Sequence, residues 1–228
     1  MEEQWNSRTC GLIGEKNETK LGSFKILVFG VGGVGGFVIE ALVRAGIENI
    51  TIVDNDVVSI SNLNRQIIAL YSTIGMPKVD VMRGRILGIN PNVNVMALKQ
   101  FVTKDNVKDF NLQDYDYVID AIDNVTAKLA ISEECFKNNI KIISCMGTGN
   151  KLNPDMFVID DIFNSSVCPL AKVIRSELKK RNITKLNVLY SKEPPCVKSR
   201  TPASISFVPS VAGLKIAGYV IKDLLDIK

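Results

Sequence analysis

The sequence predicts an α/β protein with a Rossmann-like, doubly wound and mostly parallel sheet, followed by a C-terminal α/β extension. Strand-like and helix-like stretches alternate through the first two-thirds of the chain. A glycine-rich turn follows the first apolar strand and opens a helix, and an aspartate ends the next strand. The 228 residues are 46% hydrophobic, which is enough for one buried core, so we expect a single domain.

The first βαβ unit carries a phosphate-binding pattern. Residues 26–29 form a predicted strand, and residues 38–45 have helical spacing. Between them Gly30, Gly32 and Gly35 have GxGxxG spacing, with Gly33 inside the same turn. Glycine lets the backbone approach a phosphate, whose charge then lies against the free N–H groups of the helix start. A second strand, residues 50–53, ends at Asp54, where a carboxylate can accept hydrogen bonds from ribose hydroxyls.

A polar cluster that a redox cofactor does not need follows Asp54. Its members are Asn62, Asn64, Arg65, Gln66 and Lys78. Hydride transfer requires no such set, whereas attack at a phosphate needs charges fixed beside it. We expect residues 63–71 to form a helix, capped by one of the two asparagines. The amino end of a helix is unfavourable for Arg65 unless an anion lies near it.

Two aspartates flank the end of the predicted strand at residues 117–119. One carboxylate there can hold Mg²⁺ through water and phosphate oxygens, and we favour Asp123 over Asp120. The other can cap the helix that runs from Asn124 to about residue 138. The turn at residues 146–149 follows another strand, and ligands gather at this edge of such sheets.

The other predicted elements continue the alternation. We expect helices at residues 78–87, 105–110, 169–181 and 208–225, and strands at 93–98, 141–145 and 156–159. Residues 192–202 form a polar, proline-bearing loop. Residues 172–200 are strongly basic, with only Glu177 and Glu193 as acids. This segment suits an anionic partner such as RNA, although a solvated surface has the same composition.

Composition excludes several classes of chemistry. The chain has no histidine, so a Ser-His-Asp or Cys-His nucleophile cannot form, and catalysis must use carboxylates, cations and backbone amides. Its five cysteines are scattered without a CxxC pair, which disfavours disulfides and zinc and favours a reducing, cytoplasmic setting. The amino terminus does not resemble a signal peptide, and no apolar run is long enough to span a membrane.

The motifs between Arg8 and Asn124 resemble those of ubiquitin-activating-type adenylyltransferases, which include the enzymes that activate sulfur-carrier proteins. The matching positions are the glycine turn, Asp54, residues 61–66, Lys78, Asp123 and Asn124. The resemblance implies that these positions bind ATP and Mg²⁺. It also implies that Asp54 binds the ribose and that Asp123 is the magnesium ligand. Three catalytic cations, Arg65, Lys78 and Arg8, would balance the charge of the triphosphate. The resemblance also implies a homodimer in which an arginine of the extended leader, here Arg8, reaches the partner subunit's site.

Over nearly its whole length the chain is most similar, within that group, to the tRNA threonylcarbamoyladenosine dehydratases. The later matching stretches are residues 146–151, 153–154, 161–162, 169–172 with Arg175, 190–191 with Glu193, and 204–209 with Gly213. The resemblance implies ATP-dependent cyclisation of threonylcarbamoyladenosine beside the anticodon of tRNA, through an adenylated carboxylate. It divides the single domain into a leader (1–24), a nucleotide-binding core (25–150) and a substrate-side extension (151–228).

The chain departs from the family's sequence pattern at two cysteines. Cys168 stands where we expect an acid, and Cys196 is the thiol nearest to a position at which some relatives carry cysteine. This departure counts against a sulfur-transfer role for such a cysteine, and a sulfur-relay protein stays open as a second partner.

Three other functions remain as alternatives. An activating enzyme for a ubiquitin-like sulfur carrier lacks its usual CxxC pairs here. A NAD-dependent oxidoreductase explains the glycines and Asp54 but leaves Arg65, Lys78 and Asp123 without a role. A non-enzymatic nucleotide-binding scaffold is expected to have lost one of those charged residues, and none is missing.

Overall fold

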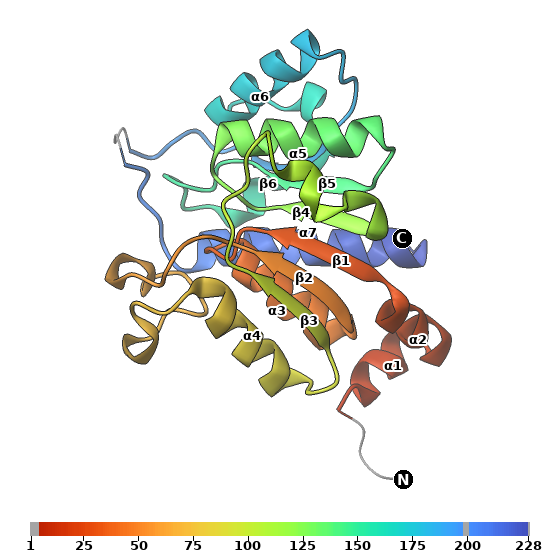
Figure 1. Ribbon diagram of the computed structural model, residues 1–228. Coiled ribbons are helices and arrows are strands. Elements are labelled where there is room, and N and C mark those ends of the chain that lie inside the picture. The colour runs from red at the N-terminus through yellow and green to blue at the C-terminus, as the bar shows by residue number, and fades with distance from the viewer. Residues whose placement is uncertain (1–4, 198–200, 228) are drawn as a thin grey trace.

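The computed structural model describes residues 5–197 and 201–227 (Figure 1). Their strands form a seven-stranded sheet in the order β3-β2-β1-β4-β5-β7-β6. β6 runs antiparallel to β7, and the other neighbouring strands pair in parallel. The strands are β1 (Lys25–Phe29), β2 (Asn49–Val53), β3 (Asn94–Leu98), β4 (Tyr117–Asp120), β5 (Ile142–Cys145), β6 (Phe157–Asp161) and β7 (Asn187–Ser191). The predicted α/β class with a mostly parallel sheet is confirmed.

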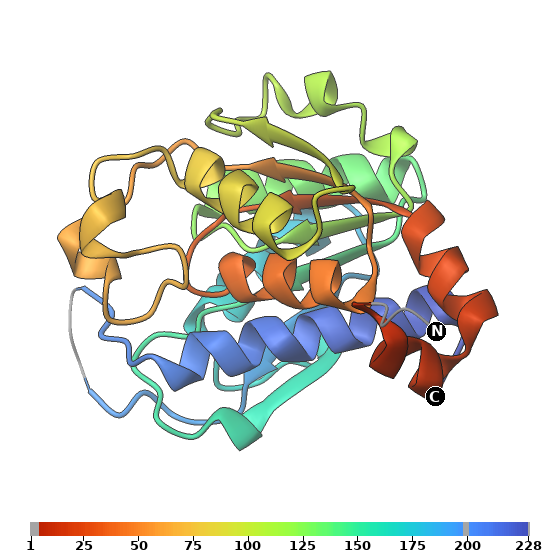
Figure 2. The ribbon, with the colours of Figure 1, turned by 90° about the horizontal axis from the view of Figure 1, so that it is seen from below.

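Helices cover both faces of this sheet. The α-helices of the described residues are α1 (Ser7–Ile13), α2 (Glu15–Ser23), α3 (Gly35–Ala45), α4 (Lys78–Ile89), α5 (Val125–Lys137), α6 (Pro169–Lys180) and α7 (Phe207–Leu225). Figure 2 shows α3, α4 and α7 beside one another across one face, and α5 and α6 lie on the other (Figure 1). Alternate residues of β1 accordingly enter two different cores, Ile26 and Val28 on the α3 side and Leu27 and Phe29 on the α5 side. Because both faces are buried, β1 is a continuous apolar run.

Local signals set several helix boundaries. The Asn124 side chain caps α5, because its Oδ1 accepts a hydrogen bond of 2.9 Å from the Ala127 N–H. Pro169 occupies the first turn of α6. On the other face, buried Glu40 of α3 accepts hydrogen bonds from Arg44 and from Arg85 of α4. This ion pair links α3 to α4 beside the sheet.

The predicted helix at residues 63–71 is wrong. The chain there forms only two short 3₁₀ turns, Ile60–Asn62 and Tyr71–Thr73, with irregular backbone between them. The Oδ1 atom of Asn62 accepts a hydrogen bond from the Ser59 N–H, and Thr73 Oγ1 donates to the Ile68 carbonyl. Such side-chain bonds to the backbone replace the helical ladder.

Three further corrections concern short segments. The leader is helical rather than extended, since α1 and α2 occupy it. The expected helix at 105–110 is a 3₁₀ turn, Val107–Phe110. The strand β7, which the sequence analysis missed, pairs with β5 and β6 and carries the sheet into the C-terminal extension.

Among residues 5–197 and 201–227, no helix has both the length and the apolar character needed to cross a membrane.

The close packing of α7 on α3 gives a direct test of the fold. A Cβ atom at Gly213 would lie 2.5 Å from the Val34 carbonyl oxygen, whereas one at Gly218, on the same helix, would have nothing within 4 Å. Gly213→Ala is therefore expected to lower the free energy of unfolding by about 1–3 kcal/mol. Gly218→Ala, the matched control, should be neutral or stabilising by up to about 1 kcal/mol. Urea denaturation measures both, and equal losses would contradict the packing.

Candidate active site

A cavity of about 690 Å³ opens where the parallel strands β1 to β5 end. β1 lies between β2 and β4, so the connections leaving β1 and β4 run to opposite faces of the sheet. Open α/β sheets bind their ligands at such a switch point. Of the residues predicted for the site, Gly30, Gly32, Gly33, Asp54, Arg65, Gln66, Lys78, Asp123 and Asn124 line this cavity.

The glycine turn is shaped by two close backbone contacts. Gly30 has a φ of +93°, and a Cβ atom there would lie 2.7 Å from the Ala121 carbonyl oxygen. A Cβ atom at Gly35 would lie 1.8 Å from the Gly30 carbonyl oxygen, so Gly35 supports the turn from beneath and does not line the cavity. Gly32 faces the cavity, and its bare backbone leaves room for a phosphate beside the start of α3.

Asp54 is held at the end of β2 by backbone donors. Its Oδ2 accepts a hydrogen bond of 2.7 Å from the Val31 N–H in the glycine turn, and its Oδ1 accepts one of 2.8 Å from the Asp56 N–H. Each carboxylate oxygen retains a further lone pair for a ribose hydroxyl. The position of Asp54 therefore fits the role that its place in the sequence predicted.

Two cations lie on the same side of the cavity. Lys78 begins α4 and is only 6% exposed, with its Nζ 2.8 Å from Asp56 Oδ2. This ion pair with Asp56 holds the ammonium group at the cavity wall. Arg65 uses Nη1 to donate to the Ser61 carbonyl and to Asn64 Oδ1. No helix begins at Arg65, so the helix-dipole argument for an anion there does not apply.

The amide side chains divide into two groups. Gln66 lines the cavity and is buried, and its Oε1 has no hydrogen-bond partner among the described residues. Asn62 and Asn64 lie outside the cavity lining. Asn62 fixes the turn at residues 59–62, and Asn64 donates a hydrogen bond of 3.0 Å to the Ser204 carbonyl. These two asparagines shape the loops around the cavity.

The two aspartates at the end of β4 have different surroundings. Asp120 is fully buried, whereas Asp123 is exposed within the cavity and forms no hydrogen bond or ion pair with another described residue. Among residues 5–197 and 201–227, no group of three cysteine, aspartate or glutamate side chains is arranged to hold a metal ion. A single free carboxylate beside phosphate oxygens is nevertheless the usual protein share of a magnesium site. Asp123 fits that role, and Asn124 serves as the helix cap.

The cavity lining also contains two further groups of residues that the sequence analysis did not assign to the site. They are Gln100, Phe101 and Val102 after β3, and Thr201, Pro202, Ser204 and Pro209 from the C-terminal extension. Phe101 could have been found, because it lies just beyond the carboxyl end of the parallel strand β3, at the edge of the sheet where ligands bind. The residues of the C-terminal extension reach the cavity through packing between segments that are far apart in the sequence, and no local sequence pattern predicts such packing.

Cys145 lines the cavity but does not provide a nucleophile. Burial raises the pKa of its thiol to about 12, so it stays protonated at neutral pH. Cys168 is buried at the start of α6. Cys196 is exposed, and its hydrogen bond to Glu193 raises the pKa of its thiol.

Arg8 lies far from the cavity of its own chain. It is exposed on α1, which packs against α2 beside the amino end of β1, at the opposite edge of the sheet (Figure 1). The structure therefore does not bring Arg8 together with Arg65, Lys78 and Asp123.

The basic segment is partly neutralised. Lys180 and Arg181 form ion pairs with Glu177, and Arg175 donates to the Ser165 carbonyl and hydroxyl. Lys198 and Arg200 lie outside the described residues. The exposed cations Lys172, Lys179, Lys185 and Lys192 remain for an anionic partner.

Glu193 joins the loop after β7 to the loop that forms the cavity wall. Its carboxylate accepts hydrogen bonds from the Leu152 and Asn153 N–H groups and from Cys196 Sγ, and its carbonyl accepts one from Lys151. Burial alone would raise the pKa of Glu193, but these donors and the charge of Lys151 hold it below its ordinary value.

The fold and the cavity place the protein among nucleotide-binding α/β proteins, and comparison identifies its family. The model of the ThiF family matches residues 6–228, so the chain belongs to the ThiF family. The tRNA threonylcarbamoyladenosine dehydratase of Bacillus subtilis is 43% identical, over 96% of this chain and 94% of that protein.

Solved structures agree with this assignment. The Escherichia coli tRNA N6-threonylcarbamoyladenosine dehydratase, TcdA, in complex with AMP has a TM-score of 0.93 at 34% identity, covering 96% of this chain and 93% of that chain. The complex of the same protein with ATP has a TM-score of 0.91 at 33% identity, with the same coverage.

Glu193 predicts an acid-dependent loss of stability. Because its folded pKa lies below its unfolded value, the carboxylate stabilises the protein above the unfolded pKa, and this contribution is lost as pH falls through the folded pKa. The urea midpoint of the wild type should therefore fall more steeply between about pH 6 and about pH 3 than that of Glu193→Gln. Glu15→Gln, exposed on α2, is the control and should follow the wild type. Parallel curves for wild type and Glu193→Gln would contradict the assignment.

Proposed function

We propose that this protein uses ATP to cyclise the threonylcarbamoyl group of threonylcarbamoyladenosine in tRNA, with loss of water, through an adenylated carboxylate. One observation carries the proposal: Arg65, Lys78 and Asp123 meet in the cavity that the glycine turn opens. The dehydratase name of the Bacillus subtilis relative and the AMP and ATP complexes of the Escherichia coli protein support it.

The chemistry suits a site without histidine. The threonyl carboxylate attacks the α-phosphorus of ATP, and pyrophosphate leaves. A nucleophile in the same threonylcarbamoyl side chain then attacks the activated carbonyl carbon, and AMP leaves with one carboxylate oxygen. The second step is intramolecular, so proximity replaces a catalytic base. This reaction class is that of an adenylate-forming ligase.

The protein's contribution is to orient the nucleotide and balance its charge. The glycine turn and the start of α3 bind phosphate, Asp54 binds the ribose, and Arg65 and Lys78 stabilise the charge that develops on the departing pyrophosphate. Gln66 supplies a buried amide beside the glycine turn. Fixed charges of this kind are already oriented before reaction, which is why they lower the barrier.

Asp123 is the residue that would hold Mg²⁺. The charged residues lining the cavity are Arg65 and Lys78 against Asp54, Asp56 and Asp123, so the site alone does not neutralise a triphosphate. When bound there, Mg²⁺ supplies the missing positive charge.

We further propose that the active form is a homodimer in which Arg8 acts on the partner's site. Arg8 is exposed and lies at the edge of the sheet opposite its own cavity, so only a second copy can use it there. An apolar surface suited to self-association lies on the segment between β2 and α4. Its exposed side chains are Val57, Ile60, Leu70, Tyr71, Ile74 and Met76.

The alternative functions differ in their products. An activating enzyme for a sulfur carrier would release pyrophosphate only with a carrier protein that ends in diglycine, and a sulfur-relay partner would need an accessible thiol, for which Cys196 is the exposed candidate. A NAD-dependent oxidoreductase would change the absorbance of its cofactor. Mass analysis of nucleosides after incubation with ATP and modified tRNA separates all three.

Removing the charge of either Asp123 or Lys78 should abolish most of the turnover without unfolding the protein. Asp123→Asn and Lys78→Met are each expected to slow pyrophosphate release with modified tRNA by about 100-fold or more, because Lys78→Met removes a positive charge beside the phosphates and Asp123→Asn removes the carboxylate that would hold Mg²⁺ there. Asp80→Asn, exposed on α4 outside the cavity, is the control and should keep the wild-type rate. A wild-type rate in either site variant would remove that residue from the mechanism.

Action of Arg8 across the dimer can be tested by mixing inactive variants. Arg8→Ala and Lys78→Met, co-expressed in equal amounts, should regain about a quarter of the wild-type activity, because half of the dimers then hold one intact site. Lys78→Met co-expressed with the double variant Arg8→Ala/Lys78→Met is the control and should stay inactive. No recovery in the first mixture would exclude action in trans.

A further inference from the structure

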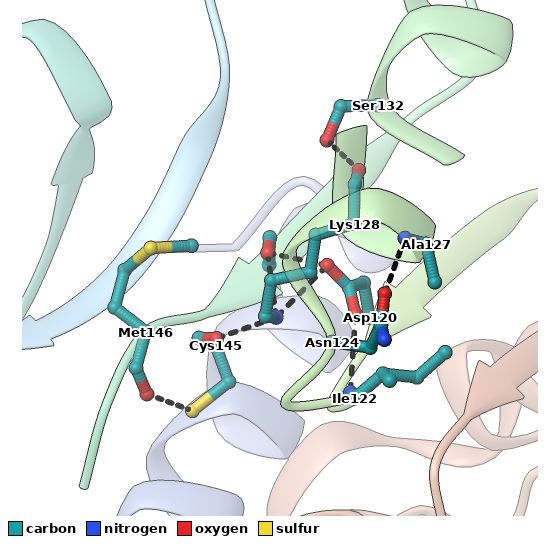
Figure 3. A network of polar contacts seen from close by, with 9 residues as sticks. Asp120, Ile122, Asn124, Ala127, Lys128, Ser132, Cys145 and Met146 are labelled. Carbon is teal, nitrogen blue, oxygen red and sulfur yellow. Dashed lines mark hydrogen bonds and ion pairs between the residues drawn. The ribbon is translucent and has the colours of Figure 1, made fainter. Parts of the chain in front are cut away.

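A fully buried lysine lies beneath the cavity, where two of its walls begin. Lys128 of α5 is 0% exposed, and its Nζ contacts Asp120 at the end of β4 and Ser144 on β5 (Figure 3). Neither Lys128 nor Ser144 lines the cavity, so substrate does not reach them. We call Asp120, Lys128 and Ser144 the buried clamp.

Every donor of the Lys128 ammonium group has a partner in the protein. Nζ donates to Asp120 Oδ2 at 3.0 Å, to Ser144 Oγ at 3.2 Å and to the Cys145 carbonyl at 2.7 Å. Ser144 Oγ in turn donates to Asp120 Oδ2 at 2.6 Å, which closes the triangle. An ammonium group has three N–H donors, so none remains for a substrate. Lys128 is therefore not a catalytic residue.

The partners of Lys128 are the starting points of two cavity walls. Asp120 also accepts a hydrogen bond of 3.1 Å on Oδ1 from the Ile122 N–H, which turns the chain towards Asp123. The Cys145 carbonyl is the last of β5, and residues 145–149 form the neighbouring wall. The same β4 loop is fixed to the end of β1, because the Ala121 N–H donates to the Phe29 carbonyl, and its Ala121 carbonyl lies against Gly30 of the glycine turn.

Stability alone gives little reason for this arrangement. Burying two charges costs about as much as their attraction returns, and well-packed apolar side chains often stabilise a core equally well. A charged triangle, in contrast, holds its three members in one relative position. Any shift that separates them leaves a buried charge without a partner, which costs much free energy.

We propose that Lys128 is a positioning residue, which fixes the wall that carries Asp123 relative to the wall at residues 145–149 through Asp120, Ser144 and the Cys145 carbonyl. The first wall presents Asp123 to the nucleotide, and the second, which follows the neighbouring strand β5, lines the same cavity. The inference rests on the proposed function for the identity of the ligand that these two walls hold. It predicts that loss of the clamp impairs turnover while the nucleotide, held by the glycine turn and Asp54, still binds.

The test uses three variants of the full chain and one control. Ser144→Ala removes one corner with little change in volume, Lys128→Met removes the cation, and Asp120→Asn/Lys128→Met removes both charges. The double variant should recover thermal stability relative to Lys128→Met, because it leaves no unpaired buried charge. Lys137→Met, an exposed change on the same helix, is the control.

Two readouts decide the outcome. We expect kcat for pyrophosphate release to fall at least about tenfold in the double variant, and about threefold in Ser144→Ala, with KM for ATP within about threefold of the wild type. Amide hydrogen exchange should become faster in residues 121–124 and 146–149 but stay unchanged in β2. Lys137→Met should match the wild type in both measurements.

Contrary results would overturn the positioning role. Wild-type kcat and exchange in the folded double variant would mean that the clamp contributes only stability. A raised KM for ATP with unchanged kcat would mean that it shapes nucleotide affinity instead. If the two Lys128 variants do not fold, the same measurements on Ser144→Ala decide. If the wild type itself releases no pyrophosphate with modified tRNA, the proposed function fails, and hydrogen exchange still tests the clamp.

Discussion

The contact between Gly30 and Ala121 is the constraint on which the rest of the structure depends. A Cβ atom at Gly30 would lie 2.7 Å from the Ala121 carbonyl oxygen, so the turns after β1 and β4 touch with no side chain between them. The helices that follow these turns, α3 and α5, then cover opposite faces of the sheet. The cavity opens where the two connections separate, and the glycine turn, Asp54 and Asp123 all reach it from neighbouring strand ends.

The charged side chains around this cavity are held in position by other groups of the protein. Asp56 holds Lys78 on one wall, and the backbone N–H groups of Val31 and Asp56 hold Asp54. On the other wall the buried clamp holds the β4 loop. A site without histidine cannot rely on proton transfer through imidazole, so its catalytic power must come from such fixed charges and from the proximity of the reacting groups.

Local patterns in the sequence were enough to find most of the predicted site residues that line the cavity. The glycine turn, Asp54 and Asp123 follow strands whose apolar runs are easy to recognise, and Lys78 opens a helix at its predicted start. The helix expected at residues 63–71 failed because asparagine and threonine side chains bond the backbone there. Lys128 shares the buried face of α5 with Ile131 and Cys135, which was a readable signal, but its partners lie on two other elements of the fold.

The central claim is that the charged groups around the glycine turn steer an acyl-adenylate. The most direct measurement is the fate of oxygen-18 placed in the threonyl carboxylate of the modified tRNA. If that carboxylate attacks the α-phosphorus, the AMP released after cyclisation carries one labelled oxygen, and the nucleoside loses one water. Unlabelled AMP, or release of ADP and phosphate in place of AMP and pyrophosphate, would contradict the account.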